Sequence, residues 1–182
     1  TKVRLATILG TFQSTLTNFK YLRHVWKKNT EEERLLGVSL TGIMDSTLTA
    51  TPSDKLEVML EMLRDTAVQT NASFATKLKI PQSTAVTCVK PSGTVSQLTD
   101  AASGIHARHN PYYIRTVRGD NKDPLTQFLV SEGIPAEPDV MKPDSTTVFS
   151  FPMKSPKGAV TRTAMTAIEQ LELWLTYQRH WC

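Results

Sequence analysis

Hydrophobic side chains recur every three or four residues in four stretches of the chain, which is the spacing of a helix with one buried face. Polar residues mark where two of these helices begin: Ser53 is placed as an N-cap, and Asp123-Pro124 supplies a cap and a proline at the first helical position. The pattern predicts helices over residues 3–21, 53–78, 124–133 and 160–181. Thr30 and Glu33 have the spacing of a capping box, which predicts that a short turn starts there.

Four shorter stretches have the composition of strands. Residues 35–43 form an apolar run that contains two glycines, and residues 83–89 alternate small and β-branched side chains. Residues 112–118 and 147–151 are rich in aromatic and β-branched side chains, and Pro152 is expected to end the last strand. Strands that alternate with helices predict an α/β protein.

The composition fits one globular domain or a large part of one. Of the 182 residues, 40% are hydrophobic and 21% are charged, and no apolar run approaches the roughly 18 residues of a membrane helix. The sequence shows no secretory signal, so we expect a cytoplasmic protein. The net charge of +4 suits anionic small molecules. A basic patch at residues 23–28 is explained by helix-end side chains, so no direct contact with nucleic acid is expected.

The segment Lys90-Pro91-Ser92-Gly93-Thr94 has the parts of an anion site. It follows a predicted strand, precedes a predicted short helix, and carries a lysine, two hydroxyls and a glycine that lets the backbone approach a ligand. Amides at the start of a helix are unpaired donors that suit a phosphate. The same residues also fit a plain tight turn in which Thr94 caps the helix, and the local sequence leaves both interpretations open.

Residues 103–118 concentrate two histidines, three arginines and two tyrosines in one passage from loop to strand. These side chains suit contact with a large anionic ligand or cofactor, for which His106 and Arg108 are candidates. The arginines equally fit the solvated face of a strand whose other face packs inward. No metal site is expected at His106 and His109, because no carboxylate or thiol lies at ligand spacing.

The two cysteines, Cys88 and Cys182, are too few for a disulfide scaffold or a four-ligand zinc site. His180 and Cys182 lie close together near the end of the last predicted helix, but no third group completes a nucleophilic triad, so we expect packing roles. Cys88 falls within a predicted strand, where a small buried thiol is the ordinary expectation.

Four stretches, taken together and in order, resemble the class II, adenosylcobalamin-dependent ribonucleoside-triphosphate reductases, specifically the monomeric type. They are ERLLGVSLTGIMD at 33–45, VKPSGTV at 89–95, SGIHARHNPYYIRTVR at 103–118 and VFSFPMK at 148–154. The resemblance implies the ten-stranded α/β barrel of these reductases, with residues 1–182 as a single partial domain from the C-terminal portion of the catalytic barrel. Both ends of the sequence fall against predicted helices, which also favours a fragment.

The activity implied by the resemblance is the reduction of ribonucleoside triphosphates to deoxyribonucleotides for DNA synthesis, by a thiyl radical generated with adenosylcobalamin. In that family the turn at Pro91, Ser92, Gly93 and Thr94 would hold substrate phosphates. The stretch from about Asp123 onward would help to seat the cobalamin, and Lys90, His106 and Arg108 are candidate ligand or cofactor contacts.

Other parts of the family's machinery are not among these residues. The radical cysteine is expected in an Asn-Pro-Cys-type loop before Thr1, so Cys88 is not that cysteine and the chain alone should be inactive. The C-terminal thiols that family members exchange with thioredoxin are also missing. Two alternatives stay open: a dimeric class II reductase that uses diphosphates, and a nucleotide-binding module without catalytic activity.

Overall fold

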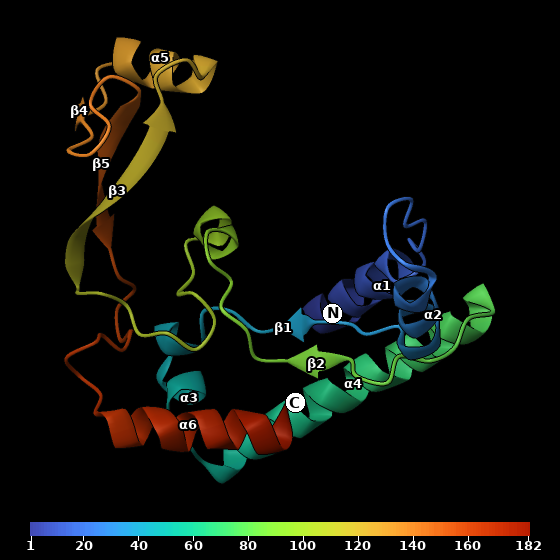
Figure 1. Cartoon of the computed structure of the whole chain (residues 1–182). Helices are drawn as coiled ribbons and strands as arrows, with labels where there is room; N and C mark the ends of the chain where they lie inside the picture. Colours follow the sequence, from blue (N-terminus) through green and yellow to red (C-terminus); the bar gives the residue numbers. More distant parts are fainter.

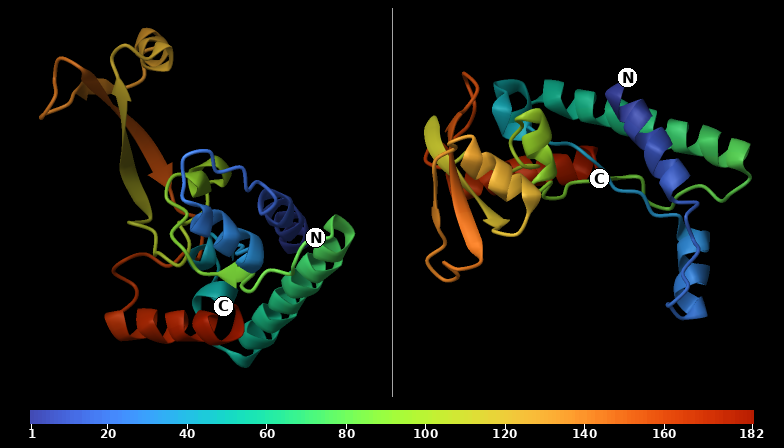
Figure 2. Two further views of the ribbon diagram at one scale, coloured as in Figure 1. Left: turned by 45° about the vertical axis from the view of Figure 1, so that its right-hand side comes forward. Right: turned by 90° about the horizontal axis from the view of Figure 1, so that it is seen from above.

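A computed structural model describes all of residues 1–182. The chain forms a body of helices around two short strands, and an arm that projects away from this body (Figure 1; Figure 2). The body contains α1 (Lys2–Gln13), α2 (His24–Glu33), β1 (Val38–Ser39), η1 (Ile43–Asp45), α3 (Thr47–Ala50), α4 (Asp54–Leu78), β2 (Thr87–Cys88), η2 (Val95–Thr99) and α6 (Ala167–His180). The arm contains β3 (Tyr112–Asp120), α5 (Pro124–Ser131), β4 (Ala136–Pro138) and β5 (Thr146–Lys154).

The strands β1 and β2 are parallel, with Val38 opposite Thr87, and α4 lies between them in the chain. This is a βαβ unit, as the predicted order of strands and helices requires. Both strands are shorter than predicted, because the regular ladder covers only two residues of each. Single bonds from Leu36 N to Ala85 O and from Val38 N to Val86 O continue the contact toward the N-terminal side.

The main core lies where α4 and α6 meet the parallel strands. Leu56, Leu60, Tyr177 and Trp181 are fully buried there. Trp181 also joins α6 to β2 by hydrogen bonds, because its indole nitrogen donates to the Cys88 carbonyl over 2.9 Å and its own carbonyl accepts from the Thr87 hydroxyl over 2.6 Å. The predicted Ser53 cap of α4 is confirmed, since its hydroxyl accepts from the Leu56 amide.

The first helix differs from its prediction in length and in the face that it buries. It ends at Gln13, because the hydroxyls of Ser14 and Thr15 donate back to its last carbonyls and Arg34 donates to the carbonyl of Ser14. Its buried side chains are Thr7 and Thr11, whereas most of the predicted apolar stripe is exposed. The contact with α4 is partly polar: the Asn71 amide donates to the Thr11 hydroxyl over 3.0 Å.

The capping box predicted at Thr30 is wrong. Thr30 lies in the last turn of α2, where its hydroxyl donates to the carbonyl of Trp26. Pairs of Lys and Glu four residues apart favour helix through this segment, so the helix begins earlier than the threonine. A complete capping box occurs instead at Thr166 and Glu169, and it starts α6 later than the predicted residue 160.

The arm is an antiparallel sheet in the order β3-β5-β4, with α5 packed at its far end (Figure 1). The predicted end of β5 at Pro152 is wrong, because the strand continues to Lys154. The Ser150 amide donates to the carbonyl of Pro135, on the side of β5 that faces β4. Backbone nitrogens two residues apart in a strand face the same side, so the nitrogen of Pro152 also faces that side, at a position beyond the residues that β4 pairs. No ladder bond is lost there, which makes proline acceptable.

Arg108 joins the base of the arm to the body. Its side chain is 3% exposed and donates to both carboxylate oxygens of Asp45, over 2.7 Å and 3.1 Å, and to the carbonyl of Asp100 over 2.6 Å. Its amide donates to the carbonyl of Val160, and its carbonyl accepts from the amide of Arg162. These bonds join the segment that enters the arm to the segment that leaves it. The hydrogen bond with Asp45 raises the pKa of Arg108 further above its usual range, so the charge is permanent.

The molecule exposes more surface than a compact domain of its size. Its accessible surface is 12261 Å² for 20.3 kDa, against about 8,800 Å² expected from the size scaling of folded monomers. Large apolar side chains contribute to the excess, among them Leu5 and Leu9 on α1 and Ile168, Leu171 and Trp174 on α6. No helix has the length and apolar content that crossing a membrane requires.

The Arg108 cluster gives a first prediction. Asp45→Asn leaves the buried Arg108 charge without its main partner and should lower the free energy of unfolding by about 3 kcal/mol. Asp100→Asn is the matched control, because the Asp100 side chain is 65% exposed and its loss should cost less than about 1 kcal/mol. Denaturant unfolding of the full-length protein measures both values. Equal losses would show that the buried pair has no special role.

Candidate functional site

The turn at residues 90–94 lies where the sequence placed it, directly after a strand of the parallel pair. Because β1 and β2 run in the same direction, their carboxyl ends lead into residues 40–45 and 89–94 at one edge. In α/β folds ligands bind outside the carboxyl ends of the strands. The candidate site therefore lies at the edge of the body where this architecture favours binding.

Three successive backbone amides in the turn have no partner in the protein. The amides of Ser92, Gly93 and Thr94 donate to no carbonyl or side chain, although the Ser92 carbonyl accepts from Val95 over 3.1 Å. Gly93 has a φ of +56°, and a Cβ atom there would meet nothing within 4 Å, so the backbone is open on that side. Thr94 stands at the N-cap position of η2, but its side chain makes no capping bond.

Hydroxyl groups from three segments meet beside the turn. The Thr41 and Ser92 hydroxyl oxygens are 3.0 Å apart, and the Ser92 hydroxyl donates to that of Ser103 over 3.2 Å. Thr41 donates to the Ala102 carbonyl and accepts from the Gly104 amide, so it links the loop after β1 to the loop after η2. This network fixes the orientation of the Ser92 side chain.

Gly104 sets how closely these loops approach. Its φ is +53°, and a Cβ atom at this position would lie 2.6 Å from the carbonyl oxygen of Lys90. Only glycine combines that backbone conformation with that contact. The turn is thus held by backbone packing as well as by hydrogen bonds.

A cavity of about 500 Å³ opens beside the turn, between it and α1. Lys90, Pro91 and Ser92 line it together with Ser39 and Thr41 from the end of β1. Lys90 is exposed and takes part in no ion pair, while its amide donates to the Ser39 hydroxyl over 3.3 Å. Of the residues singled out in the sequence, Lys90, Pro91 and Ser92 therefore meet at this cavity, whereas Gly93 and Thr94 do not line it.

The other two candidate contacts have different surroundings. Arg108 is paired with Asp45 and Asp100 inside the protein, and its role as a ligand contact stays a prediction. His106 is exposed and lines a further cavity of about 380 Å³ that reaches Gly93. No three His, Cys, Asp or Glu side chains come together in an arrangement that would hold a metal ion.

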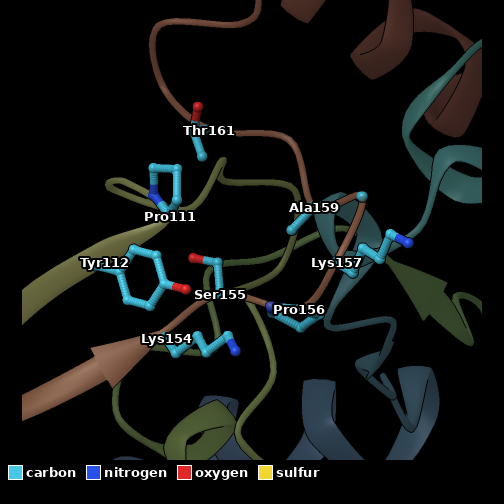
Figure 3. A pocket seen from close by; sticks show the side chains of 9 residues that line it. Pro111, Tyr112, Lys154, Ser155, Pro156, Lys157, Ala159 and Thr161 are labelled. Atoms are coloured by element: carbon cyan, nitrogen blue, oxygen red, sulfur yellow. The ribbon is translucent and has the colours of Figure 1, made fainter.

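A separate cavity of about 370 Å³ lies where β5 leaves the arm (Figure 3). Figure 3 shows Tyr112, Ser155 and Lys154 close together, with Lys157 on the other side of the Ser155-Pro156 turn. The Lys154 ammonium lies 5.8 Å from the centre of the Tyr112 ring. Neither lysine has a salt-bridge partner, so the cavity offers positive charge to a ligand.

The two cysteines lie near each other, since the Cys182 thiol is close to Cys88 and to the backbone of Val89. Cys88 is half-buried in β2 with its sulfur toward Gly37. Burial raises the pKa of the Cys182 thiol, so this thiol is less readily ionised than a free cysteine. His180 pairs with Glu61 and Glu57, and not with Cys182. These contacts agree with packing roles.

Sequence reasoning missed Thr41, Ser103 and Asp45 as parts of the site. All three lie within or at the ends of the stretches that carry the family resemblance, but no local pattern singles them out. Their contacts join segments that only the folded chain brings together.

No family model matches the chain. Among curated proteins it is 33% identical over 159 residues to the adenosylcobalamin-dependent ribonucleoside-triphosphate reductase of Euglena gracilis, a match that covers 86% of this chain and 22% of the relative. It is 28% identical over 180 residues to the reductase of the same name from Lactobacillus leichmannii, which covers 83% of the chain and 24% of that protein. The chain thus spans about a quarter of the length of these relatives.

A solved crystal structure of a B12-dependent, class II ribonucleotide reductase superposes on this chain with a TM-score of 0.82 and 22% sequence identity. The match covers 98% of this chain and 29% of the other. It shows that body and arm together have the fold of one part of such an enzyme. Over the stretch that it spans, the chain is therefore homologous to the adenosylcobalamin-dependent ribonucleoside-triphosphate reductases, as its sequence motifs predicted.

Proposed function

We propose that this chain is the substrate-phosphate-binding part of an adenosylcobalamin-dependent reductase that converts ribonucleoside triphosphates to deoxyribonucleotides. The observation that carries the proposal is the turn at residues 92–94, where three successive amides are free at the carboxyl edge of two parallel strands. Successive unpaired amides form a concave donor group that suits a phosphate. The homologous proteins are named ribonucleoside-triphosphate reductases, and a ribonucleoside triphosphate carries phosphate groups that this turn could bind.

In this proposal the free amides of residues 92–94 and the Thr94 hydroxyl donate to phosphate oxygens, and the Ser92 hydroxyl turns its proton from Ser103 to the phosphate. Lys90 adds positive charge from the neighbouring cavity, which Ser92 also lines. The bonds from Thr41 and Ser103 hold Ser92 in place before the substrate arrives. Because the backbone amides are already oriented, little conformational entropy is lost on binding. The turn contributes position, and the chemical step takes place elsewhere on the nucleotide.

The cofactor that the relatives' names specify is adenosylcobalamin, and we propose that it binds near the base of the arm. The cavity around Tyr112, Lys154, Ser155 and Lys157 presents ammonium and hydroxyl groups without a single acidic side chain in its lining. Such donors fit the phosphodiester and the amide carbonyls at the edge of a cobalamin, and a volume of about 370 Å³ is too small for the corrin itself. When bound, the cofactor supplies the radical that begins nucleotide reduction.

We further propose that additional polypeptide packs against this chain, and that the reaction draws its electrons from thioredoxin or a similar dithiol. The packing proposal is supported by the accessible surface, which exceeds that of a compact domain and includes apolar faces on α1 and α6. In this proposal neither cysteine is the thiyl centre: the Cys88 sulfur faces Gly37 inside the body, and burial raises the pKa of the Cys182 thiol. This chain alone should therefore bind phosphate groups without reducing them.

The phosphate assignment is tested by removing the two hydroxyls of the turn. In the full-length protein, Ser92→Ala with Thr94→Ala should raise the KM for the nucleoside triphosphate by at least about tenfold, because a hydrogen bond to a charged group contributes about 1.5–3 kcal/mol and about 1.4 kcal/mol is a factor of ten. Adenosylcobalamin affinity, followed by its absorbance change on binding, should stay within twofold.

Thr99→Ala is the control for this pair, because Thr99 bonds only to its neighbour Ser96 at the far end of η2. It should leave the KM unchanged. A double variant with the parental KM would contradict the phosphate assignment, and one that lost cobalamin and substrate together would indicate a collapsed loop instead of a lost contact.

Cys88 gives an independent prediction. Its sulfur faces Gly37 inside the body, so Cys88→Ser should keep at least about half of the turnover and cost less than about 2 kcal/mol of stability. Turnover and thermal unfolding of the full-length protein measure the two effects. Complete loss of turnover in a folded variant would mean that Cys88 takes part in the chemistry.

A further inference from the structure

A second cavity touches the other end of the phosphate turn and is strongly basic. It has a volume of about 380 Å³ and includes Gly93 of the turn and Ser103, the hydrogen-bond partner of Ser92. Its basic lining residues are His106, Arg108, His109, Arg115 and Arg162, and no Asp or Glu is among the residues that line it. Arg108 is neutralised by Asp45, whereas Arg115 and Arg162 have no salt-bridge partner.

Two polar atoms in this cavity lack the hydrogen bonds that buried atoms normally make. The side-chain oxygen of Gln97 and the Nε of Arg115 are the buried side-chain polar atoms without any partner, and both residues line this cavity. Native structures rarely leave such atoms unpaired unless a water, ion or ligand completes them. A terminal amide can present its nitrogen in place of its oxygen by turning over, so Gln97 can also donate to an anion.

Another arginine of the same strand has different surroundings. Arg118 lies further along β3, is 65% exposed and pairs with Asp139 over 2.7 Å. Arg115 is half-buried beside Tyr113 and has no acidic partner. Because side chains alternate between the two faces of a strand, Arg115 and Arg118 lie on opposite faces of β3, and it is the face of Arg115 that borders the cavity.

We infer that this cavity holds the terminal phosphate of the substrate, and that Arg115 and Arg162 thereby make the protein prefer a nucleoside triphosphate to a diphosphate. The inference rests on the proposed function. A phosphate chain bound at Ser92 to Thr94 can extend past Gly93, where the next phosphate meets two unpaired guanidinium groups and the orphaned Arg115 nitrogen. Arginine is well suited to this role, because its planar donors match phosphate oxygens.

The test compares the binding of CTP and CDP to the full-length protein by titration calorimetry. Arg115→Gln and, separately, Arg162→Gln should each weaken CTP binding by about tenfold and change CDP binding by less than about twofold. Arg115→Lys should recover part of the CTP affinity, because it restores the charge without the fork of donors. Arg118→Gln removes the same charge from the same strand outside the cavity and should leave both affinities unchanged.

The outcomes separate this inference from the function on which it rests. If Ser92→Ala with Thr94→Ala weakens both nucleotides while the Arg115 and Arg162 variants weaken them equally or not at all, the terminal-phosphate site is wrong and the turn assignment stands. If the hydroxyl variant changes neither nucleotide, the proposed function itself fails. Loss of cobalamin affinity alone in the arginine variants would assign the cavity to the cofactor and overturn the inference.

Discussion

The ion pair between Arg108 and Asp45 is the interaction on which the geometry of the site depends. Asp45 ends the loop after β1 and also accepts from the amide of Ala102, while Arg108 holds the carbonyl of Asp100 and the base of the arm. One buried charge pair therefore fixes three segments that are distant in sequence. Buried pairs of this kind add little net stability over apolar residues of similar volume, but removing one partner is strongly destabilising because the other charge stays buried. The hydroxyl network around Thr41 and the close approach of Gly104 to Lys90 both depend on these three segments being held together.

The sequence predicted elements well where the signal was local. The caps at Ser53 and Asp123 operate within three residues, and both helices begin where these residues place them. Errors arose where distant contacts decide. The hydroxyls after Gln13 and the Arg34 side chain end α1 early, and the buried face of that helix carries Thr7 and Thr11 because α4 meets it with Asn71. Pro152 stays in its strand only because β4 has already ended beside it.

The site was predictable in part for the same reason. A strand, a proline-glycine turn and two hydroxyls are contiguous, so residues 90–94 carry their own signal. The sequence left open whether Arg115 contacts a ligand or solvent, because alternation along a strand assigns a side chain to one face without showing what packs against that face. What lies there depends on the return of the chain through Arg162, more than forty residues later. Arg108 shows the converse: its type suited a ligand, but two carboxylates from other loops already bind it.

The position of Trp181 near the end of the sequence affects when the body can fold during synthesis. Trp181 bonds both residues of β2 across sequence separations of 94 and 93 residues. At ribosomal speeds of about 5–20 residues per second, the parallel strands wait roughly 5–20 s for the residue that completes their packing. During that interval α4 has emerged with Leu56 and Leu60 still uncovered. The nascent chain therefore presents an apolar surface of the kind that chaperones bind until α6 covers it.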